Sequence, residues 1–292
     1  MYALTQTAQL EEFRRKLIDD AIDLAIREDL GDERLDLTTA SVVKTDRQVS
    51  GSVYCKQESV VIAGLRVFAH VLNKFDAQIS VEQRVAEGQF IESSPSVIAT
   101  FTGPASNVLK GERIALNLLQ RMSAIATVTH QFVELAKPFG IEIRDTRKTT
   151  PGLRVFEREA VALGGGQNHR FGLFDAILIK DNHIQFAGDI TTAIQRAKEA
   201  HPELPIEVEA TTLAQVEEVL KIGAQTILLD NMSAQTIREA VAIIKGACLI
   251  EVSGGVNFRN IKSYLIEGVN AISVGALTHS APNIDISLEV EI

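Results

Sequence analysis

Six short apolar runs alternate with helical segments in the second half of the chain, and this alternation constrains the fold more than any other feature. The runs are IEIRDT at 141–146, DAILIKDNH at 175–183, IEVEA at 206–210, TILLDN at 226–231, CLIEVSGGV at 248–256 and AISVGA at 271–276. Strands that alternate with helices predict βαβ units and a parallel sheet. Gly223, Gly246 and Gly268 follow the later helical segments at nearly equal intervals, as expected of glycines that end helices.

Two folds can contain such a βα ladder, and a glycine motif distinguishes them. A doubly wound sheet that binds a dinucleotide carries GxGxxG after a strand. The nearest match, GGGQNH at 164–169, has His169 in place of the third glycine. We therefore expect a βα barrel, open and incomplete, rather than a doubly wound sheet.

The first half of the chain is organised differently. Apolar residues at helical spacing predict an amphipathic helix over 10–27. Short apolar runs from 49 to 102, with a helical interlude at 67–75, are typical of a strand-rich α+β domain. Gly103 and Pro104 then precede a long helical pattern over 106–136. We place a domain boundary near residue 105, so that 1–105 form the first domain and 106–279 form the barrel domain.

Composition narrows the class of protein. The 292 residues are 46% hydrophobic and 23% charged, which is typical of a folded globular chain. The net charge of −9 lacks the basic footprint of a nucleic-acid-binding protein. No signal peptide is recognisable at the acidic N-terminus, and no apolar stretch reaches the ~18 residues of a membrane span. Cys55 and Cys248 are far apart and lack metal-ligand spacing. We expect a cytoplasmic protein without a nucleic-acid or membrane partner.

Polar residues stand at the ends of five of the six runs. They are Arg144, Asp145, Thr146, Arg147 and Lys148; Lys180, Asp181, Asn182 and His183; Glu207 and Glu209; Asp230 and Asn231; and Glu251 and Ser253. The active site of a βα barrel gathers at the carboxyl ends of its strands. Because side chains alternate along a strand, Glu207 and Glu209 share one face, and so do Glu251 and Ser253. We expect these carboxylates to converge inside the barrel, the alternative being that they are solvated loop residues.

Glycines and basic residues indicate an anionic ligand. Ser253, Gly254, Gly255 and Gly275 follow the last two strands, where barrels often bind phosphate. The basic residues of the 144–183 region are Arg147, Lys148, Arg154, His169, Arg170 and Lys180. In an acidic chain this concentration predicts a small polyanionic substrate. Exposed loop cations paired with surface acids, and a purely structural His169, remain the alternatives.

Longer motifs resemble the quinolinate phosphoribosyltransferase family, the decarboxylating nicotinate-nucleotide pyrophosphorylases of NAD biosynthesis. The motifs are RDTRKTTPGLR at 144–154, GGGQNHRFGLFDAILIKDNH at 164–183, EVEA at 207–210, LLDN at 228–231, EVSGGV at 251–256 and SVGALTHSAPNIDISLE at 273–289. The resemblance covers nearly the whole chain. It implies an N-terminal α/β sandwich domain joined to an open α/β barrel, with the C-terminal tail, residues 280–292, returning to the first domain.

The resemblance also implies the reaction. Ribose phosphate passes from phosphoribosyl pyrophosphate to the ring nitrogen of quinolinate with Mg²⁺, and pyrophosphate and carbon dioxide leave to give nicotinate mononucleotide. The residues implied for quinolinate are Arg147, His169, Arg170 and Lys180, joined by Arg121 from the neighbouring subunit of a homodimer or hexamer. Lys148 is implied for the pyrophosphate, and Glu209 and Asp230 for the ribose and the metal. The 5-phosphate would bind Ser253, Gly254, Gly255 and Gly275.

Three other functions remain open at this point. A paralogous phosphoribosyltransferase-like protein, such as those associated with molybdenum transport, would take another acceptor. A Schiff-base aldolase could use Lys180 at a strand end. A phosphometabolite sensor would keep the glycines, but would not need the carboxylates of Glu209 and Asp230.

Overall fold

The computed structural model describes residues 2–43 and 47–291, and the chain divides into two compact units. Unit 1 comprises residues 1–130, 149–165 and 281–292, and unit 2 comprises 131–148 and 166–280. Residue 105, the expected domain boundary, is the first residue of helix α4 (Ala105–Ala136). The boundary itself stays a prediction. The C-terminal tail from Ala281 belongs to unit 1.

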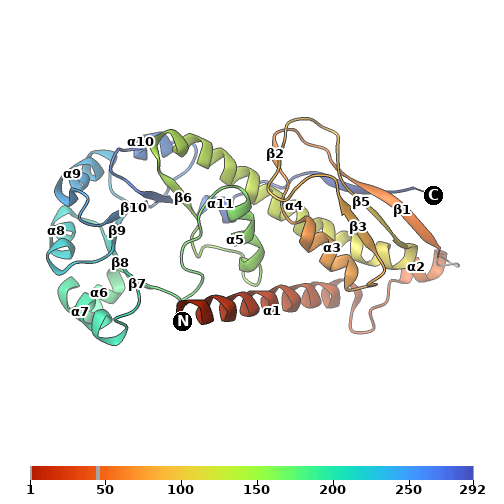
Figure 1. Cartoon of the computed structure of the whole chain (residues 1–292), viewed down its shortest axis with the longest axis horizontal. Coiled ribbons are helices and arrows are strands. Elements are labelled where there is room, and N and C mark those ends of the chain that lie inside the picture. Colours follow the sequence, from red (N-terminus) through yellow and green to blue (C-terminus); the bar gives the residue numbers. More distant parts are fainter. Residues whose placement is uncertain (1, 44–46, 292) are drawn as a thin grey trace. The chain divides into compact units, whose positions relative to one another are not determined.

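Unit 2 contains the six strands expected from the apolar runs. They are β6 (Glu142–Arg144), β7 (Ile177–Ile179), β8 (Ile206–Ala210), β9 (Thr226–Asp230), β10 (Leu249–Ser253) and β11 (Ala271–Ser273). Neighbouring strands are parallel, in the order β6-β11-β10-β9-β8-β7 (Figure 1). The edge strands β6 and β7 follow each other in the chain, so the sheet has the order of a βα barrel with an open seam between them. The predicted α/β fold with an open barrel is confirmed.

Alternation along the strands gives the sheet one apolar and one polar face. Val208, Ile227 and Ile250 lie in register and are buried. Three helices precede these three strands in turn and run along the outer side of the sheet: α7 (Ile190–Ala200), α8 (Leu213–Ile222) and α9 (Ala234–Ile244) (Figure 1). The opposite face carries Glu209 and Glu251 on either side of Leu228, in the same register. The polar residues therefore share the inner face, as their period of two predicts.

The helices begin and end as the sequence pattern indicates. The side chains of Asp189, Thr212 and Ser233 cap α7, α8 and α9, each accepting from a backbone N–H of the first turn. Gly223 ends α8, whereas Gly268 lies four residues beyond the short helix α10 (Ile261–Tyr264). Two further short helices complete unit 2, α6 (Asp181–Ala187) and α11 (Ala276–His279).

The open seam is where the chain leaves unit 2. After β6 the chain enters unit 1 at Thr149, forms helix α5 (Arg154–Leu163), and returns at Gly166 before β7 begins. On its return it makes an isolated parallel bridge between Gln167 and Arg144 of β6. The segment between these two strands therefore contributes to both units.

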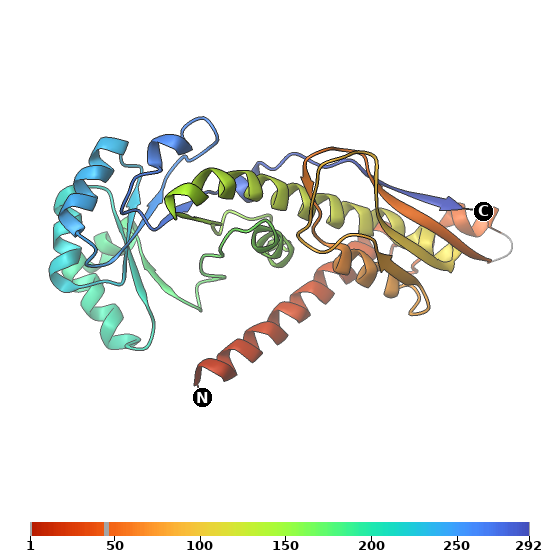
Figure 2. The ribbon, with the colours of Figure 1, turned by 45° about the horizontal axis from the view of Figure 1, so that its top comes forward.

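Unit 1 is built around a four-stranded antiparallel sheet in the order β12-β1-β5-β3. Its strands are β1 (Gln48–Cys55), β3 (Ser80–Gln83), β5 (Ser96–Pro104) and β12 (Ile286–Glu291), with β2 (Val60–Val61) and β4 (Phe90–Ile91) as a separate pair. Its helices are α1 (Tyr2–Leu30), α2 (Leu37–Val42), α3 (Leu65–Asn73), α5 and most of α4. Figure 2 shows the C-terminal strand β12, in blue, beside β1. The expected strand-rich α/β domain with a helical interlude is confirmed.

Among the described residues, no helix combines the length and the apolar character that crossing a membrane requires.

Candidate active site

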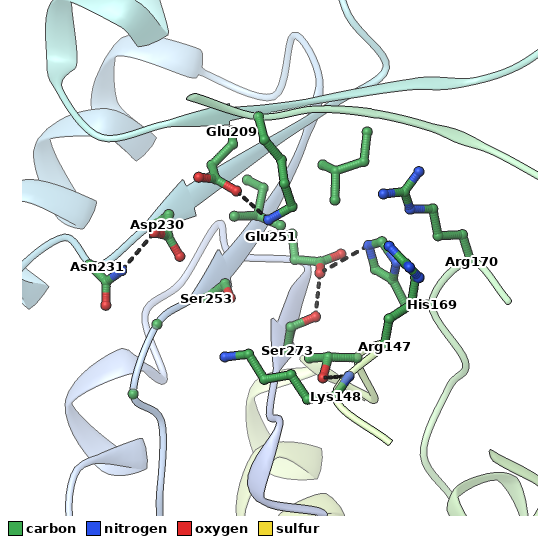
Figure 3. Close-up of a pocket in the computed structure, with 16 residues that line it drawn as sticks. Arg147, Lys148, His169, Arg170, Glu209, Asp230, Asn231, Glu251, Ser253 and Ser273 are labelled. Atoms are coloured by element: carbon green, nitrogen blue, oxygen red, sulfur yellow. Dashed lines mark hydrogen bonds and ion pairs between the residues drawn. The ribbon is translucent and has the colours of Figure 1, made fainter. Parts of the chain in front are cut away.

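A cavity of about 460 Å³ opens at the carboxyl ends of the unit 2 strands (Figure 3). Ten of the residues expected in a site line it: Arg147, Lys148, His169, Arg170, Lys180, Glu209, Asp230, Ser253, Gly254 and Gly255. Thr146, Asn231, Glu251 and Ser273 line it as well. Strand-end residues from all five of the runs with polar ends therefore converge within one unit, whereas Asp181, Asn182 and His183 are exposed at the start of α6.

His169 forms an ion-pair cluster at the base of the cavity. Its Nε2 lies 2.8 Å from Oε2 of Glu207 and 3.7 Å from Oε1 of Glu251. Burial by itself lowers the pKa of His169, but the hydrogen bond to Glu207 and the negative charges of Glu207, Glu251 and Asp145 raise this pKa above its ordinary value. The surroundings of His169 therefore favour its cationic form. The backbone N–H of His169 donates to Asp145 at 2.7 Å, which fixes the loop that carries it.

Glu251 is the buried acid of the cluster. It accepts hydrogen bonds from Nη1 of Arg144 at 2.8 Å and from the hydroxyl of Ser273. Burial raises the pKa of Glu251, and the nearby Glu207 carboxylate adds to this effect. Ligand atoms of His169, Glu207 and Glu251 lie within 4.8 Å of one another. His169 contacts both carboxylates, and Glu251 also contacts Arg144, so two acids face two basic groups in this cluster.

Arg147 and Arg170 form a cationic wall on one side of the cavity (Figure 3). Burial lowers the pKa of Arg170, and the positive charge of Arg147 lowers it further. Nε of Arg147 is buried and has no hydrogen-bond partner among the described residues. A buried donor without a partner is costly, and two guanidinium groups that repel each other favour an anionic ligand between them. This wall is suited to a planar ligand with more than one carboxylate.

Glu209 and Asp230 lie on the opposite side, on neighbouring strands. Oε2 of Glu209 accepts from Nζ of Lys180 at 2.8 Å, and Oδ2 of Asp230 accepts from Nδ2 of Asn231 at 2.6 Å. Carboxylate oxygens are the ligands that Mg²⁺ prefers, and Mg²⁺ is usually held by one or two carboxylates together with substrate phosphates and water. The donor set therefore fits Mg²⁺ bound jointly with a pyrophosphate.

The turn after β10 is shaped by glycine. Gly254 has φ 106°, and a Cβ there would lie 2.3 Å from Oδ1 of Asn231. Only glycine fits this backbone, which packs directly against Asn231 beside the cavity. Gly275 is not among the residues that line the cavity; it precedes α11, and a Cβ there would lie 3.1 Å from Cδ of Lys148.

Arg121 belongs to unit 1, as does Arg154 at the start of α5. Arg121 lies on α4, and its guanidinium pairs with the buried carboxylate of Glu157 on α5 at 2.9 Å. Arg121 does not line the unit 2 cavity of its own chain.

Four residues at the site had no assigned role in the sequence-based set: Glu207, Glu251, Ser273 and Asn231. The alternation rule already predicted that Glu207 and Glu251 share the inner face with Glu209 and Ser253, but it assigned no role to either carboxylate. Glu157 also carried a signal, since it lies beside Phe156 and three residues before Ala160 on the buried stripe of α5. A carboxylate on an apolar helix face is expected to have a buried partner, because burial of an unpaired charge is costly.

Comparison with protein families gives two adjacent matches. Residues 36–123 match the family described as "Quinolinate phosphoribosyl transferase, N-terminal domain", and residues 125–289 match "Quinolinate phosphoribosyl transferase, C-terminal domain". The two matches together cover most of the chain.

Individual relatives agree with this result. A nicotinate-nucleotide pyrophosphorylase (carboxylating) of Mycobacterium leprae is 41% identical over 276 residues, which is 93% of this chain and 96% of the relative. A probable enzyme of the same name from Synechocystis is 39% identical over 278 residues, covering 94% and 92%. The solved structure of the nicotinate-nucleotide pyrophosphorylase from Francisella tularensis superposes with a TM-score of 0.89 at 34% identity, covering 94% of this chain and 96% of that one.

Proposed function

Because the chain belongs to the quinolinate phosphoribosyltransferase family, we propose that the cavity of the open barrel is where quinolinate and phosphoribosyl pyrophosphate react. The enzyme is a decarboxylating pentosyltransferase that forms nicotinate mononucleotide for NAD biosynthesis. The roles of single residues, the metal, the shared site and the location in the cell are part of this proposal.

The observation that carries the assignment of the acceptor site is the cationic wall. Quinolinate has two adjacent carboxylates on one ring, and Arg147 and Arg170 are two guanidinium groups beside one cavity. A carboxylate at Nε of Arg147 would give that buried donor a partner. His169 lines the same cavity, and in its protonated form it would add a third positive charge. Lys180, whose Nζ contacts Glu209, lines the same cavity and contributes a further positive charge.

The phosphoribosyl donor occupies the other half of the cavity in this proposal. The 5-phosphate binds at Ser253, Gly254 and Gly255, with Gly275 beside the segment that carries Lys148. When C1 of the ribose loses pyrophosphate it becomes cation-like, and the carboxylates of Glu209 and Asp230 stabilise positive charge there. Glu209 and Asp230 would also hold Mg²⁺, which would supply positive charge to neutralise the leaving pyrophosphate. Lys148 supplies a further positive charge to the same leaving group.

Decarboxylation follows from the first step. The bond between C1 and the ring nitrogen gives the pyridine ring a formal positive charge. The carbon–carbon bond to the adjacent carboxylate then breaks, carbon dioxide leaves, and the electron pair stays on the ring carbon beside that charge. A proton from solvent completes nicotinate mononucleotide. The protein's part is to hold the ring and the second carboxylate at the cationic wall.

One assay tests the proposed function directly. The purified chain is incubated with quinolinate, phosphoribosyl pyrophosphate and Mg²⁺, and nicotinate mononucleotide and carbon dioxide are measured. We expect both products in equal amounts, and no product when Mg²⁺ is chelated. Product formation from another acceptor but not from quinolinate would refute the proposal. Cell fractionation tests the cytoplasmic location.

The proposed shared site of a homodimer, whether or not dimers assemble further into a hexamer, is tested by mixing. Arg121→Ala and Arg170→Ala chains are refolded together in equal amounts. Half of randomly assorted dimers are mixed, and one site in each mixed dimer has both arginines intact, so about a quarter of all sites should recover. Absence of recovery in confirmed heterodimers would show that Arg121 does not serve its neighbour.

A further inference from the structure

A buried carboxylate of unit 1 holds Arg121, and none of the steps above uses it. Glu157 lies on α5 with its side chain fully buried. Its Oε1 accepts from Nε of Arg121 at 3.2 Å and from Nη2 of Arg121 at 2.9 Å. The same carboxylate accepts from the backbone N–H of Thr150 at 3.0 Å and from the Thr150 hydroxyl at 2.8 Å. Four donors from two chain segments therefore meet at one carboxylate.

Net stability is a weak explanation for this arrangement. The desolvation of a buried carboxylate and guanidinium roughly offsets their attraction, so such pairs add little to the free energy of unfolding. Two N–H bonds from one planar guanidinium do fix its orientation. The side chain of Arg121 is 24% exposed, so it is held from its buried side while part of it stays accessible.

The residue that follows α5 lies very close to α4. Gly164 directly follows α5, and a Cβ there would lie 2.4 Å from the carbonyl oxygen of Ala126 on α4. Next to the pair, Met122 of α4 and Phe156 of α5 are fully buried. The backbone that carries Arg121 and Glu157 therefore has little freedom to shift.

We propose that Glu157 is a positioning residue for the reaction: it holds the Arg121 guanidinium in the orientation in which Arg121 binds quinolinate in the neighbouring subunit's site. Glu157 touches no substrate and acts through Arg121. This inference rests on the proposed function, and in particular on the shared site.

A second route from Glu157 has to be separated from this one. Thr150 stands two residues after Lys148, so the carboxylate could instead order the pyrophosphate-binding segment of its own chain. The first route acts on the partner's site, and the second acts on the chain's own site. Subunit mixing distinguishes the two routes.

Kinetics give the first test. Glu157→Gln keeps the shape of the side chain and removes its charge. We expect the KM for quinolinate to rise about tenfold, as for loss of one charge-assisted hydrogen bond, with the KM for phosphoribosyl pyrophosphate and kcat within about twofold of wild type. Glu159→Gln on the same helix is the matched control and should match wild type. A folded Glu157→Gln enzyme with an unchanged KM for quinolinate overturns the proposal, as does an effect confined to phosphoribosyl pyrophosphate.

Mixing gives the second test. Glu157→Ala chains refolded with Arg170→Ala chains should recover activity at about a quarter of the sites, because a mixed dimer has one site with its own Arg170 and a correctly held Arg121 from the partner. Glu157→Ala chains refolded with Arg121→Ala chains should recover none. The reverse pattern means that Glu157 acts on its own site, which overturns the proposal. Where Glu157→Ala does not fold, Glu157→Gln replaces it in the same mixtures, which are then assayed at a quinolinate concentration well below the KM of that variant.

The same experiments separate this inference from the proposed function. If the wild-type chain makes no nicotinate mononucleotide, the proposed function itself fails. If wild type is active and the Arg121→Ala with Arg170→Ala mixture recovers, but the Glu157→Ala with Arg170→Ala mixture does not, only the role of Glu157 fails.

Discussion

Charged residues on the inner face of the barrel pair with residues of opposite charge from other parts of the chain. Lys180 and Glu209 are neighbours across β7 and β8, whereas His169 reaches Glu207 and Glu251 from the loop that returns to unit 2. Each pair joins a basic group to a carboxylate, so a neutral substitution of one residue leaves the charge of the other without that partner. The consequences can be measured one residue at a time.

Asp230→Asn tests the proposed metal role. The new amide oxygen can still accept the hydrogen bond from Asn231, so the fold should survive. The lost charge should lower Mg²⁺-dependent kcat/KM by about a hundredfold and shift activity to higher Mg²⁺ concentration. Steady-state kinetics over a Mg²⁺ series, with circular dichroism as the folding control, measure both effects. Wild-type rates with unchanged Mg²⁺ dependence would argue that Asp230 has no metal role.

The raised pKa of His169 predicts how binding and stability depend on pH. A group whose folded pKa is raised contributes stability that is present below its unfolded pKa of about 6.5 and is lost as pH rises through the folded pKa. Affinity for quinolinate should fall over the same interval above 6.5. Glu207→Gln should move the His169 titration to lower pH, as measured by NMR of the imidazole. A His169 titration that is unchanged in this variant would contradict the role of Glu207.

Acceptor selectivity follows from the same charges. Nicotinate lacks one carboxylate and would leave a positive group of the wall without a partner, at a cost of about 1 to 3 kcal/mol for each group. We expect kcat/KM for quinolinate to exceed that for nicotinate by more than tenfold at saturating phosphoribosyl pyrophosphate. Equal kcat/KM values for quinolinate and nicotinate would show that the cationic wall does not bind the second carboxylate.

At the scale of elements, the sequence predicted strands and helices better than the segments between them. All six apolar runs became strands, and the pattern at 106–136 became α4, because period and burial decide such elements locally. The seam between β6 and β7 was not predicted in detail, since the departure of 149–165 into unit 1 depends on packing between distant segments. For the same reason the partners of His169 and Arg121 could not be read from spacing.

The turn after β10 offers a test at this scale. Gly254→Ala would force a Cβ against Asn231 at φ 106°, whereas Gly255→Ala at φ 61° would meet no atom within 4 Å. We expect Gly254→Ala to raise the KM for phosphoribosyl pyrophosphate at least tenfold and to lower the melting temperature. Gly255→Ala carries only backbone strain of about 1 kcal/mol. Similar kinetics for the two variants would mean that the close approach to Asn231 is unimportant for the donor site.

At the scale of the whole molecule, unit 1 is assembled from three separate stretches of chain. Its C-terminal stretch contributes β12, which pairs with β1 and buries Ile286. The backbone carbonyl of Ile286 also accepts a hydrogen bond from the Gln120 side chain of α4. The end of the chain is therefore part of the core of its first unit.

Ile286→Ala should consequently destabilise the protein by about 2 to 5 kcal/mol while leaving the unit 2 cavity intact. Val290→Ala, at the exposed end of the same strand, should change stability by about 0.5 kcal/mol or less. Urea unfolding of both variants, with steady-state kinetics below the transition, measures the two effects. A similar loss in both would indicate that the strand contributes through its backbone pairing alone.

The open seam also sets the order in which the molecule can assemble. Arg147 and Lys148 precede the excursion into unit 1, and His169 and Arg170 follow it, so the cationic wall stands on the two stretches of chain that border the seam. β6 is an edge strand of the sheet, and its only strand partner there is β11, more than a hundred residues later in the chain. Contacts of such long sequence separation form late in folding. During refolding, helical and strand signals should therefore return well before catalytic activity, and the slowest measurable phase should be the recovery of quinolinate binding.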